Sequence, residues 1–330
     1  MIEATAPVRI CDNGGWTDTW FGAPGRVLNI AVKPGVQVAI RPSAGPDPVL
    51  LVADSFGDRY PVVPGRPRVT RHPLLEAAVD ALAPPEGLAV EIVVCSSVPA
   101  GCSTGTSASV AVALLGALAR LRGKDLTARE VAYAAHSLEV EVLGVESGIQ
   151  DQLSAAFGGI NYLEIEPYPE ATVHALAPWE ELSPLLTLVY LGRAHESGAV
   201  HQQVIEGAGR HGSGVFSRLR EAAQASRDAV VRQDLAGFGR AMIANTEAQK
   251  ALHPALVGAD ARRVVEVATA RGALGWKVNG AGGDGGSITI LSPTFEAKAA
   301  LERRITELDA RYELLPIQVS EAGLEVRGTL

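Results

Sequence analysis

The fold is decided by the stretch Pro99-Ala100-Gly101-Cys102-Ser103-Thr104-Gly105-Thr106-Ser107. A β-rich run, residues 88–98, precedes it, and an apolar run rich in alanine, residues 107–122, follows it. A loop of small residues lets backbone N–H groups approach phosphate oxygens, and the start of the next helix adds unpaired donors and about half a positive charge. The stretch therefore predicts a phosphate-binding loop between a strand and a helix. Its hydroxyl groups could equally cap the helix without any ligand.

The loop is not a P-loop, because no lysine follows Gly105. A second glycine-rich stretch, Gly280-Ala281-Gly282-Gly283-Asp284-Gly285-Gly286, contains a literal G-x-G-x-x-G. The dinucleotide-binding turn needs a helix after this pattern, whereas residues 287–291 predict a strand, so we reject that interpretation. A glycine turn between two strands can instead come close to another loop.

Composition and charge exclude several functional classes. The 330 residues favour two domains, and 47% hydrophobic with 20% charged residues is typical of a globular protein. The net charge of −8, without any cluster of lysine and arginine, argues against nucleic acid as a partner. The cysteines at 11, 95 and 102 predict free thiols in a reducing compartment. Residues 1–10 lack the pattern of a secretory signal, and the longest apolar run, residues 108–121, is too short to span a membrane. We expect a cytoplasmic protein without a membrane partner.

Local patterns predict an α+β chain with a first domain over residues 1–180 and a second over residues 181–330. Strands are expected at residues 27–40, 88–98, 160–165, 187–191, 274–278, 287–291 and 313–319. Helices are expected at residues 107–122, 127–143, 215–232, 235–252, 261–270 and 294–311, with a short one from Asp151. Thr127 and Glu130 have the spacing of a capping box.

Two carboxylates are candidates for chemistry. Phosphoryl transfer to an alcohol needs a group that orients the hydroxyl, Mg²⁺ on the phosphate oxygens and positive charge nearby. Glu139 lies on the expected helix 127–143 and Asp151 begins the next one, so both side chains can face one site. Single carboxylates on helices are usually solvated, and this is the interpretation for Glu141 and Glu146.

These stretches together resemble the GHMP kinase family, named for galactokinase, homoserine kinase, mevalonate kinase and phosphomevalonate kinase. The segment from Arg9 to Asp18, with Gly-Gly-Trp-Thr-Asp at its end, is similar to the first motif of the sugar kinases in this family. Residues 99–109 resemble the P-x-x-x-G-L-G-S-S-S-A loop, and residues 280–286 resemble the third motif, which packs against that loop. The resemblance implies the two-domain GHMP kinase fold, with an N-terminal domain like domain 2 of ribosomal protein S5 and a ferredoxin-like C-terminal domain.

Site residues follow from the resemblance, position by position. Asp151 is expected to be the catalytic base with Arg9 beside it, and Ser107 with Glu139 to bind Mg²⁺. The residues expected to bind ATP are Pro99, Gly101, Cys102, Ser103, Thr104, Gly105, Thr106, Ser107, Ala108, Gly282 and Gly283. The residues expected to bind the acceptor are Asp18, Trp16, Thr17, Gly148, Gln150, His195 and Gly282. For Trp16 and His195 a purely structural role stays open.

The expected function is an ATP-dependent sugar kinase. Residues 14–19 look like fucose kinases and residues 148–159 like heptose 7-phosphate kinases, and both of these phosphorylate an anomeric hydroxyl. The acceptor is therefore expected to be O1 of a heptose 7-phosphate or of a related sugar, with the protein a monomer or homodimer. Two alternatives remain: a catalytically silent sensor of the same fold, which the presence of Ser107, Glu139 and Asp151 disfavours, and a kinase for a non-sugar alcohol, which Asp18 disfavours.

Overall fold

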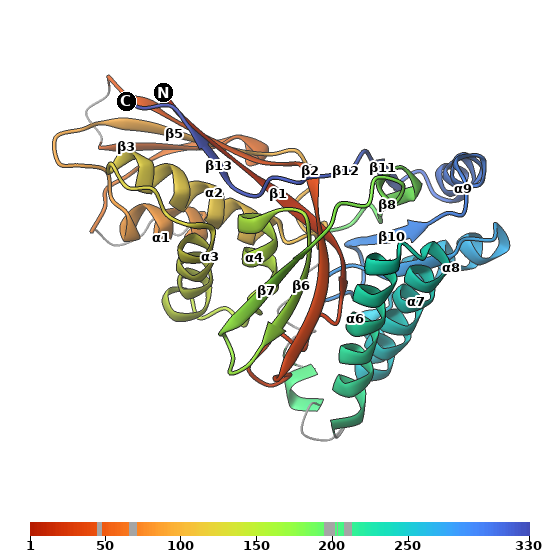
Figure 1. Ribbon diagram of the computed structural model, residues 1–330. Coiled ribbons are helices and arrows are strands. Elements are labelled where there is room, and N and C mark those ends of the chain that lie inside the picture. Colours follow the sequence, from red (N-terminus) through yellow and green to blue (C-terminus); the bar gives the residue numbers. More distant parts are fainter. Residues whose placement is uncertain (45–47, 66–70, 195–201, 203, 208–212) are drawn as a thin grey trace.

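A large sheet forms the first half of the molecule (Figure 1). The computed structural model describes residues 1–44, 48–65, 71–194, 202, 204–207 and 213–330. Within them the nine-stranded sheet has the order β13-β1-β2-β5-β3-β4; β6 and β12 also pair with β2, and β7 pairs with β6. Its strands are β1 (Ile2–Asn13), β2 (Gly25–Pro42), β3 (Val49–Ala53), β4 (Asp58–Val62), β5 (Val90–Ser96), β6 (Ile160–Ile165), β7 (Ala171–Leu176), β12 (Gln318–Val319) and β13 (Glu325–Arg327).

The central strand β2 changes character along its length. Near its end, Val36, Val38 and Ile40 are buried while Gln37 is exposed, which is the alternation of a strand with one covered face. From Val27 to Val32 every residue is buried, because this part lies between helices on both faces. A polar side chain in this doubly covered part must therefore find its hydrogen-bond partner inside the protein.

Helices α1 (Pro73–Ala81), α2 (Thr106–Leu121), α3 (Ala128–Ser137) and α4 (Gln150–Phe157) cover one face of this sheet (Figure 1). The predicted capping box is present, since Thr127 accepts from the backbone N–H of Glu130 and the Glu130 carboxylate accepts from that of Thr127. The predicted helix 127–143 is helical along its length but not α-helical throughout, because α3 ends at Ser137 and a π-helical turn follows directly at Leu138–Val142. Such turns occur mostly inside α-helices and are frequent at functional sites.

A second, four-stranded antiparallel sheet has the order β11-β8-β10-β9. Its strands are β8 (Leu186–Tyr190), β9 (Gly275–Val278), β10 (Ser287–Leu291) and β11 (Glu313–Leu315). Helices α8 (Ala259–Ala270) and α9 (Phe295–Leu308) pack on it, while α6 (Ser213–Arg232) and α7 (Leu235–Leu252) fill the space toward β2. Short 3₁₀ turns lie at Asp54–Phe56, Ser183–Leu185 and Pro254–Leu256. The predicted α+β class is confirmed.

Two predictions about secondary structure were wrong. No helix was expected before residue 107, yet helix α1 lies there, and Pro73 at its first position is a typical helix start. The predicted strand 313–319 is two strands in different sheets: β11 pairs with β8, and β12 pairs with β2. Pro316, which lies between them, has no backbone N–H and so cannot continue a ladder.

The chain returns to the first sheet at its far end, where β13 pairs with β1. The predicted domain boundary at 180 falls between β7 and β8, that is, between the two sheets, and the division into two domains stays a prediction. In the part of the chain that the structure describes, no helix combines the length and the apolar character that crossing a membrane requires.

Candidate active site

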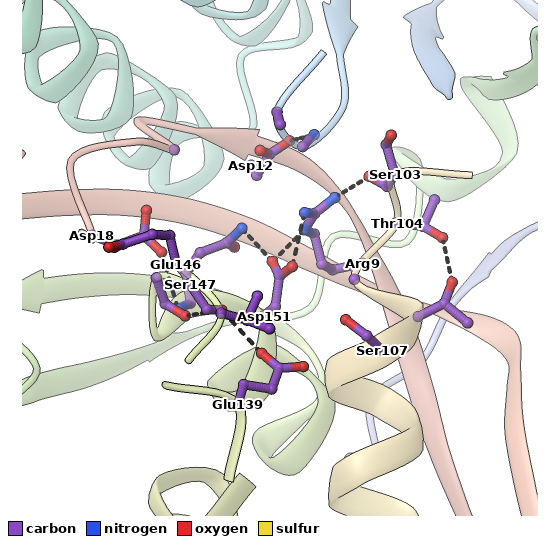
Figure 2. A pocket seen from close by; sticks show the side chains of 18 of the residues that line it. Arg9, Asp12, Asp18, Ser103, Thr104, Ser107, Glu139, Glu146, Ser147 and Asp151 are labelled. Carbon is purple, nitrogen blue, oxygen red and sulfur yellow. Dashed lines mark hydrogen bonds and ion pairs between the residues drawn. The ribbon is translucent and has the colours of Figure 1, made fainter. Parts of the chain in front are cut away.

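A cavity of about 440 Å³ lies where the two halves of the molecule meet (Figure 2). Its walls come from residues within 9–19, 101–107 and 139–151, with Leu74 and the turn at 280–281. Of the predicted site residues, those lining it are Arg9, Trp16, Asp18, Gly101, Cys102, Ser103, Thr104, Gly105, Thr106, Ser107, Glu139, Gly148, Gln150 and Asp151. The structure thus brings together residues from all three motifs.

The predicted phosphate-binding loop, residues 99–107, ends at the start of α2. Gly105 precedes the helix with a φ of +69°, a left-handed conformation that favours glycine. Among the described residues no side chain caps α2, so the alternative interpretation of the hydroxyl groups as helix caps is wrong. The Ser103 hydroxyl oxygen is buried and has no hydrogen-bond partner in the described part of the chain. Uncapped helix N–H groups and a buried hydroxyl suit an anionic phosphate.

Arg9 and Asp151 form a two-point ion pair at the floor of the cavity. Arg9 Nε donates to Asp151 Oδ1 at 2.7 Å and Nη2 donates to Oδ2 at 3.1 Å, while Nη1 donates to the backbone oxygen of Ser103 (Figure 2). Burial opposes the charge on Arg9, but the carboxylates of Asp151, Asp12 and Asp18 raise the pKa of its guanidinium above the ordinary value. Arg9 therefore joins the phosphate loop to the predicted catalytic carboxylate.

Glu139 and Ser107 are adjacent beneath the loop. The π-helical turn carries Glu139, whose Oε2 accepts hydrogen bonds from Gln152 Nε2 at 2.7 Å and Ser147 Oγ at 3.0 Å. Burial, with the charge of Asp151, raises the pKa of Glu139 to about 7, and hydrogen bonds from Ser147 and Ser107 oppose that rise.

These two side chains fit a magnesium ion bound together with a nucleotide. Mg²⁺ prefers oxygen ligands and typically takes one or two from the protein, with phosphates and water supplying the others. Among the described residues no group of three or more His, Cys, Asp or Glu side chains is placed to bind a metal ion by itself. The hydroxyl of Ser107 and the carboxylate of Glu139 can supply two oxygen ligands, which suits a magnesium ion whose other ligands are phosphate and water.

Asp18, predicted to bind the acceptor, lies at the wall of the cavity. Its Oδ2 accepts a hydrogen bond from the backbone N–H of Gln150 at 3.2 Å, and Trp16 lies nearby. Burial, followed by the charge of Asp151, raises the pKa of Asp18 to about 7. Thr17 does not line the cavity, because its hydroxyl is used within the turn, donating to Gly14 O at 2.7 Å. His195 lies outside the described residues.

The glycine-rich stretch of residues 280–286 contacts the predicted phosphate-binding loop at Gly280 rather than at Gly282 and Gly283. A β-carbon on Gly280 would lie 2.9 Å from the backbone oxygen of Ser103. Gly282 and Gly283 instead face Leu256, whose oxygen accepts from Gly283 N at 2.9 Å. Neither residue lines the cavity, so nothing in the geometry supports their predicted contact with ATP.

Pro99 and Ala108, both predicted to bind ATP, also lie outside the lining of the cavity. Pro99 O accepts from Cys102 N at 3.2 Å and so closes the loop, and Ala108 is buried within α2. Their small side chains shape the loop without facing its interior.

Several lining or supporting residues were given no role in the sequence analysis, among them Asp12, Lys277 and Glu146. Asp12 is buried at the cavity wall, and its Oδ1 accepts from Lys277 Nζ and from Gly280 N, each at 3.1 Å. The ion pair of Asp12 and Lys277 joins β1 to β9, and no local sequence pattern predicts such a contact. Glu146 is exposed, as predicted, but it also lines the cavity and accepts from Trp20 Nε1 at 2.7 Å.

Comparisons with known proteins agree with this geometry. Residues 73–159 match the family model described as the GHMP kinases N terminal domain. A mevalonate kinase of Thermococcus onnurineus is 29% identical over 74% of this chain and 71% of that protein. A D-glycero-alpha-D-manno-heptose 7-phosphate kinase of Campylobacter jejuni is 26% identical over 60% of each chain.

The crystal structure of a D-glycero-D-manno-heptose 1-phosphate kinase from Bacteroides thetaiotaomicron superposes with a TM-score of 0.80 at 22% identity, over 99% of both chains. This similarity confirms the predicted fold. The matching family model describes kinases, and the Thermococcus onnurineus and Campylobacter jejuni proteins are both named as kinases, which confirms the predicted enzyme class.

Proposed function

On the premise that this chain carries the N-terminal domain of the GHMP kinases and has their fold, we propose that it is an ATP-dependent sugar kinase. The observation that carries the proposal is the position of Asp151: its carboxyl carbon would lie 3.0 Å from a β-carbon on Gly105, at the very start of α2. A carboxylate that can accept a proton thus lies beside the N–H groups that would bind the phosphates.

In the proposed reaction a sugar hydroxyl oxygen attacks the γ-phosphorus of ATP, and the bond to the bridging oxygen of ADP breaks. Asp151 orients the hydroxyl and takes its proton, while Arg9 fixes the carboxylate and adds positive charge near the transferred group. The backbone at the start of α2 holds the phosphate oxygens. Ser107 and Glu139 would hold Mg²⁺, which when bound neutralises charge on the β- and γ-phosphates.

The acceptor is proposed to be a sugar because Asp18 places a buried carboxylate oxygen at the cavity wall, where it can accept hydrogen bonds from hydroxyl groups. We propose O1 of a heptose 7-phosphate or of a related sugar, which the similarity to the heptose kinases supports. Arg9 is the one arginine or lysine among the described lining residues, and it is paired with Asp151. A phosphate group on the acceptor would therefore have to pair with a cation that is not among these residues. Activity on the phosphorylated sugar should be compared with activity on the free sugar for this reason.

The test is ADP release with Mg²⁺, ATP and a panel containing heptose, heptose 7-phosphate, fucose, galactose and mevalonate. The proposal expects turnover of at least one sugar, with ³¹P NMR identifying a phosphate at C1 of the product. Turnover of mevalonate alone would replace the sugar by a non-sugar alcohol. Nucleotide binding without any turnover would favour the silent sensor.

Cys11, Cys95 and Cys102 are free thiols, which supports the proposed cytoplasmic location. That the protein is a monomer or a homodimer stays a prediction.

A further inference from the structure

Asn29 and Gln150 are buried amide side chains beside Asp151 that no step of the proposed reaction uses. Asn29 lies on the doubly covered part of β2 with no exposed surface, and Gln150 is the first residue of α4. Asn29 Nδ2 donates to the backbone oxygen of Gln150 and to its side-chain Oε1, each at 3.1 Å. Gln150 Nε2 in turn donates to Asp151 Oδ1. The three residues form a chain of hydrogen bonds that ends on the catalytic carboxylate.

The backbone oxygen of Gln150 fixes the direction of the hydrogen bonds in this series. A carbonyl oxygen can only accept, so the amide group of Asn29 that faces Gln150 O must be its NH₂. That NH₂ also faces the Gln150 side chain, which must therefore present its oxygen to Asn29. The NH₂ of Gln150 is then left to face Asp151. With the opposite orientation an amide oxygen would lie against the carboxylate.

This arrangement leaves one polar atom of Asn29 without a hydrogen bond. Its own Oδ1 is buried without a hydrogen-bond partner in the described part of the chain. An unsatisfied buried acceptor is destabilising, and an apolar residue of similar size would avoid it. The presence of asparagine at this position is explained by the two hydrogen bonds that it donates to Gln150.

The consequence for Asp151 is that its two oxygens are not equivalent. Oδ1 accepts from Arg9 Nε and from Gln150 Nε2, which occupies both of its lone-pair directions. Among the described residues Oδ2 accepts from Arg9 Nη2 alone. Oδ2 also lies 3.1 Å from the position of a β-carbon on Gly105, so the missing side chain leaves space at this oxygen.

We propose that Asn29 and Gln150 are positioning residues that saturate Asp151 Oδ1 and so reserve Oδ2 for the acceptor hydroxyl. Asn29 acts through Gln150 by fixing which end of its amide faces Asp151. This inference rests on the proposed kinase function, because it assigns the oxygen that receives the hydroxyl proton. It also makes a structural claim about Gln150 that can be measured without any substrate.

The kinetic test is a double-mutant cycle with Asn29→Leu, Gln150→Leu and the combination of both. Loss of a hydrogen bond to a charged group predicts a kcat about 10- to 100-fold lower for Gln150→Leu, with an unchanged KM for ATP. Asn29→Leu should lower kcat several-fold in the wild type but have no further effect on kcat when residue 150 is leucine. Its effect on melting temperature should persist in both backgrounds, because the hydrogen bond to the Gln150 backbone is lost in each. Gln150→Glu, which keeps the size, should lower kcat more than Gln150→Leu.

Asn161 provides a matched control. It is a buried asparagine directly opposite Asn29 in the β2–β6 register, and its Nδ2 donates to Gly158 O at 2.6 Å. Asn161→Leu should lower the melting temperature with little change in kcat. Equal losses of kcat in Asn161→Leu and Asn29→Leu, or additive losses in the cycle, would overturn the inference.

The substrate-free measurement is a ¹H–¹⁵N spectrum of side-chain amides, with the Gln150 signals identified by their absence in Gln150→Leu. One Gln150 amide proton is expected downfield because it bonds to a carboxylate. That signal should move upfield in Asp151→Asn and should shift or split in Asn29→Leu. An Asn29→Leu spectrum with the Gln150 signals unmoved refutes the inference. An inactive wild type with the expected shifts would refute the proposed function but leave the hydrogen-bond chain supported.

Discussion

Gly148 lies directly against the carboxylate of Asp18, so closely that a β-carbon on Gly148 would be 2.0 Å from Asp18 Oδ2. The same oxygen accepts the backbone N–H of Gln150, two residues further along. The backbone of the segment before α4 therefore holds Asp18 in place. Only glycine fits at position 148, because any side chain there would collide with the Asp18 carboxylate.

Gly148→Ala should displace the Asp18 carboxylate and weaken binding of the acceptor. A misplacement of about 1 Å can cost a factor of about 100, so we expect the KM for the sugar to rise at least tenfold while the KM for ATP changes less. Steady-state kinetics measure both constants. Gly214→Ala, on α6, is the control, since no atom of the described residues lies within 4 Å of the added carbon. A sugar KM unchanged by Gly148→Ala would contradict the role of Asp18.

Asp151→Asn should abolish turnover without abolishing nucleotide binding. Removing a general base costs about 10²- to 10⁴-fold in kcat, and the Gly105 loop that faces the phosphates is left unaltered. Single-turnover kinetics and calorimetric binding of ATP measure the two effects. Glu141→Gln, an exposed carboxylate on the π-helical turn, should leave kcat unchanged. Retained turnover in Asp151→Asn would remove this residue from the catalytic role.

Ser107→Ala and Glu139→Gln should each raise the concentration of free Mg²⁺ needed for half-maximal activity, by about tenfold. The first would remove a ligand oxygen, and the second would replace a charged carboxylate ligand by a neutral amide. Titration of Mg²⁺ at a fixed, saturating concentration of ATP provides the measurement. Ser137→Ala, which loses a surface hydrogen bond to Glu141, should show the wild-type requirement. An unchanged requirement in both ligand variants would place the metal elsewhere.

Lys277→Met should destabilise the protein by about 3–5 kcal/mol, because it leaves the buried carboxylate of Asp12 without its partner. Adding Asp12→Asn should recover part of that loss, since the buried charge is then gone as well. Denaturant unfolding measures both variants. Lys124→Met, at an exposed lysine, should stay within about 0.5 kcal/mol of the wild type. Equal stability of the single and double variants would argue against a coupled pair.

The unliganded protein should lose stability as the pH rises from about 4 to about 7. Burial, and then the charge of Asp151, raises the pKa of Asp18 from the ordinary value of a carboxyl group to about 7. In this interval the folded state binds more protons than the unfolded state, so the free energy of unfolding falls with rising pH. The melting temperature should be higher at pH 5 than at pH 8, and Asp18→Asn should flatten this dependence. The same slope in both proteins would assign the effect to other groups.

Features that depend on neighbouring residues were predictable from the sequence. The strand before Pro99, the helix after Gly105 and the capping box at Thr127 all follow from local composition and spacing, and the structure contains each of them. The motif resemblance added the long-range part, in which Arg9 meets Asp151. Together they give the main walls of the cavity.

Features that depend on distant or subtle packing were not predictable. Asp12 and Lys277 each look ordinary in their own segments, and their ion pair exists because β1 and β9 meet in space. Helical periodicity cannot distinguish an α-helix from the π-helical turn that carries Glu139, since the two differ by one residue in a single turn. The split of residues 313–319 between two sheets likewise depends on which strand edges remain free.

The pairing of β13 with β1 affects how the chain can fold during synthesis. N-terminal segments emerge from the ribosome first, yet one edge of β1 has no partner until residues 325–327 have been made. Until then the nascent chain exposes unpaired backbone groups on a strand that carries Arg9, and exposed edges promote pairing with other chains. The order of synthesis thus leaves this edge of β1 open to pairing with other chains until residues 325–327 have been made.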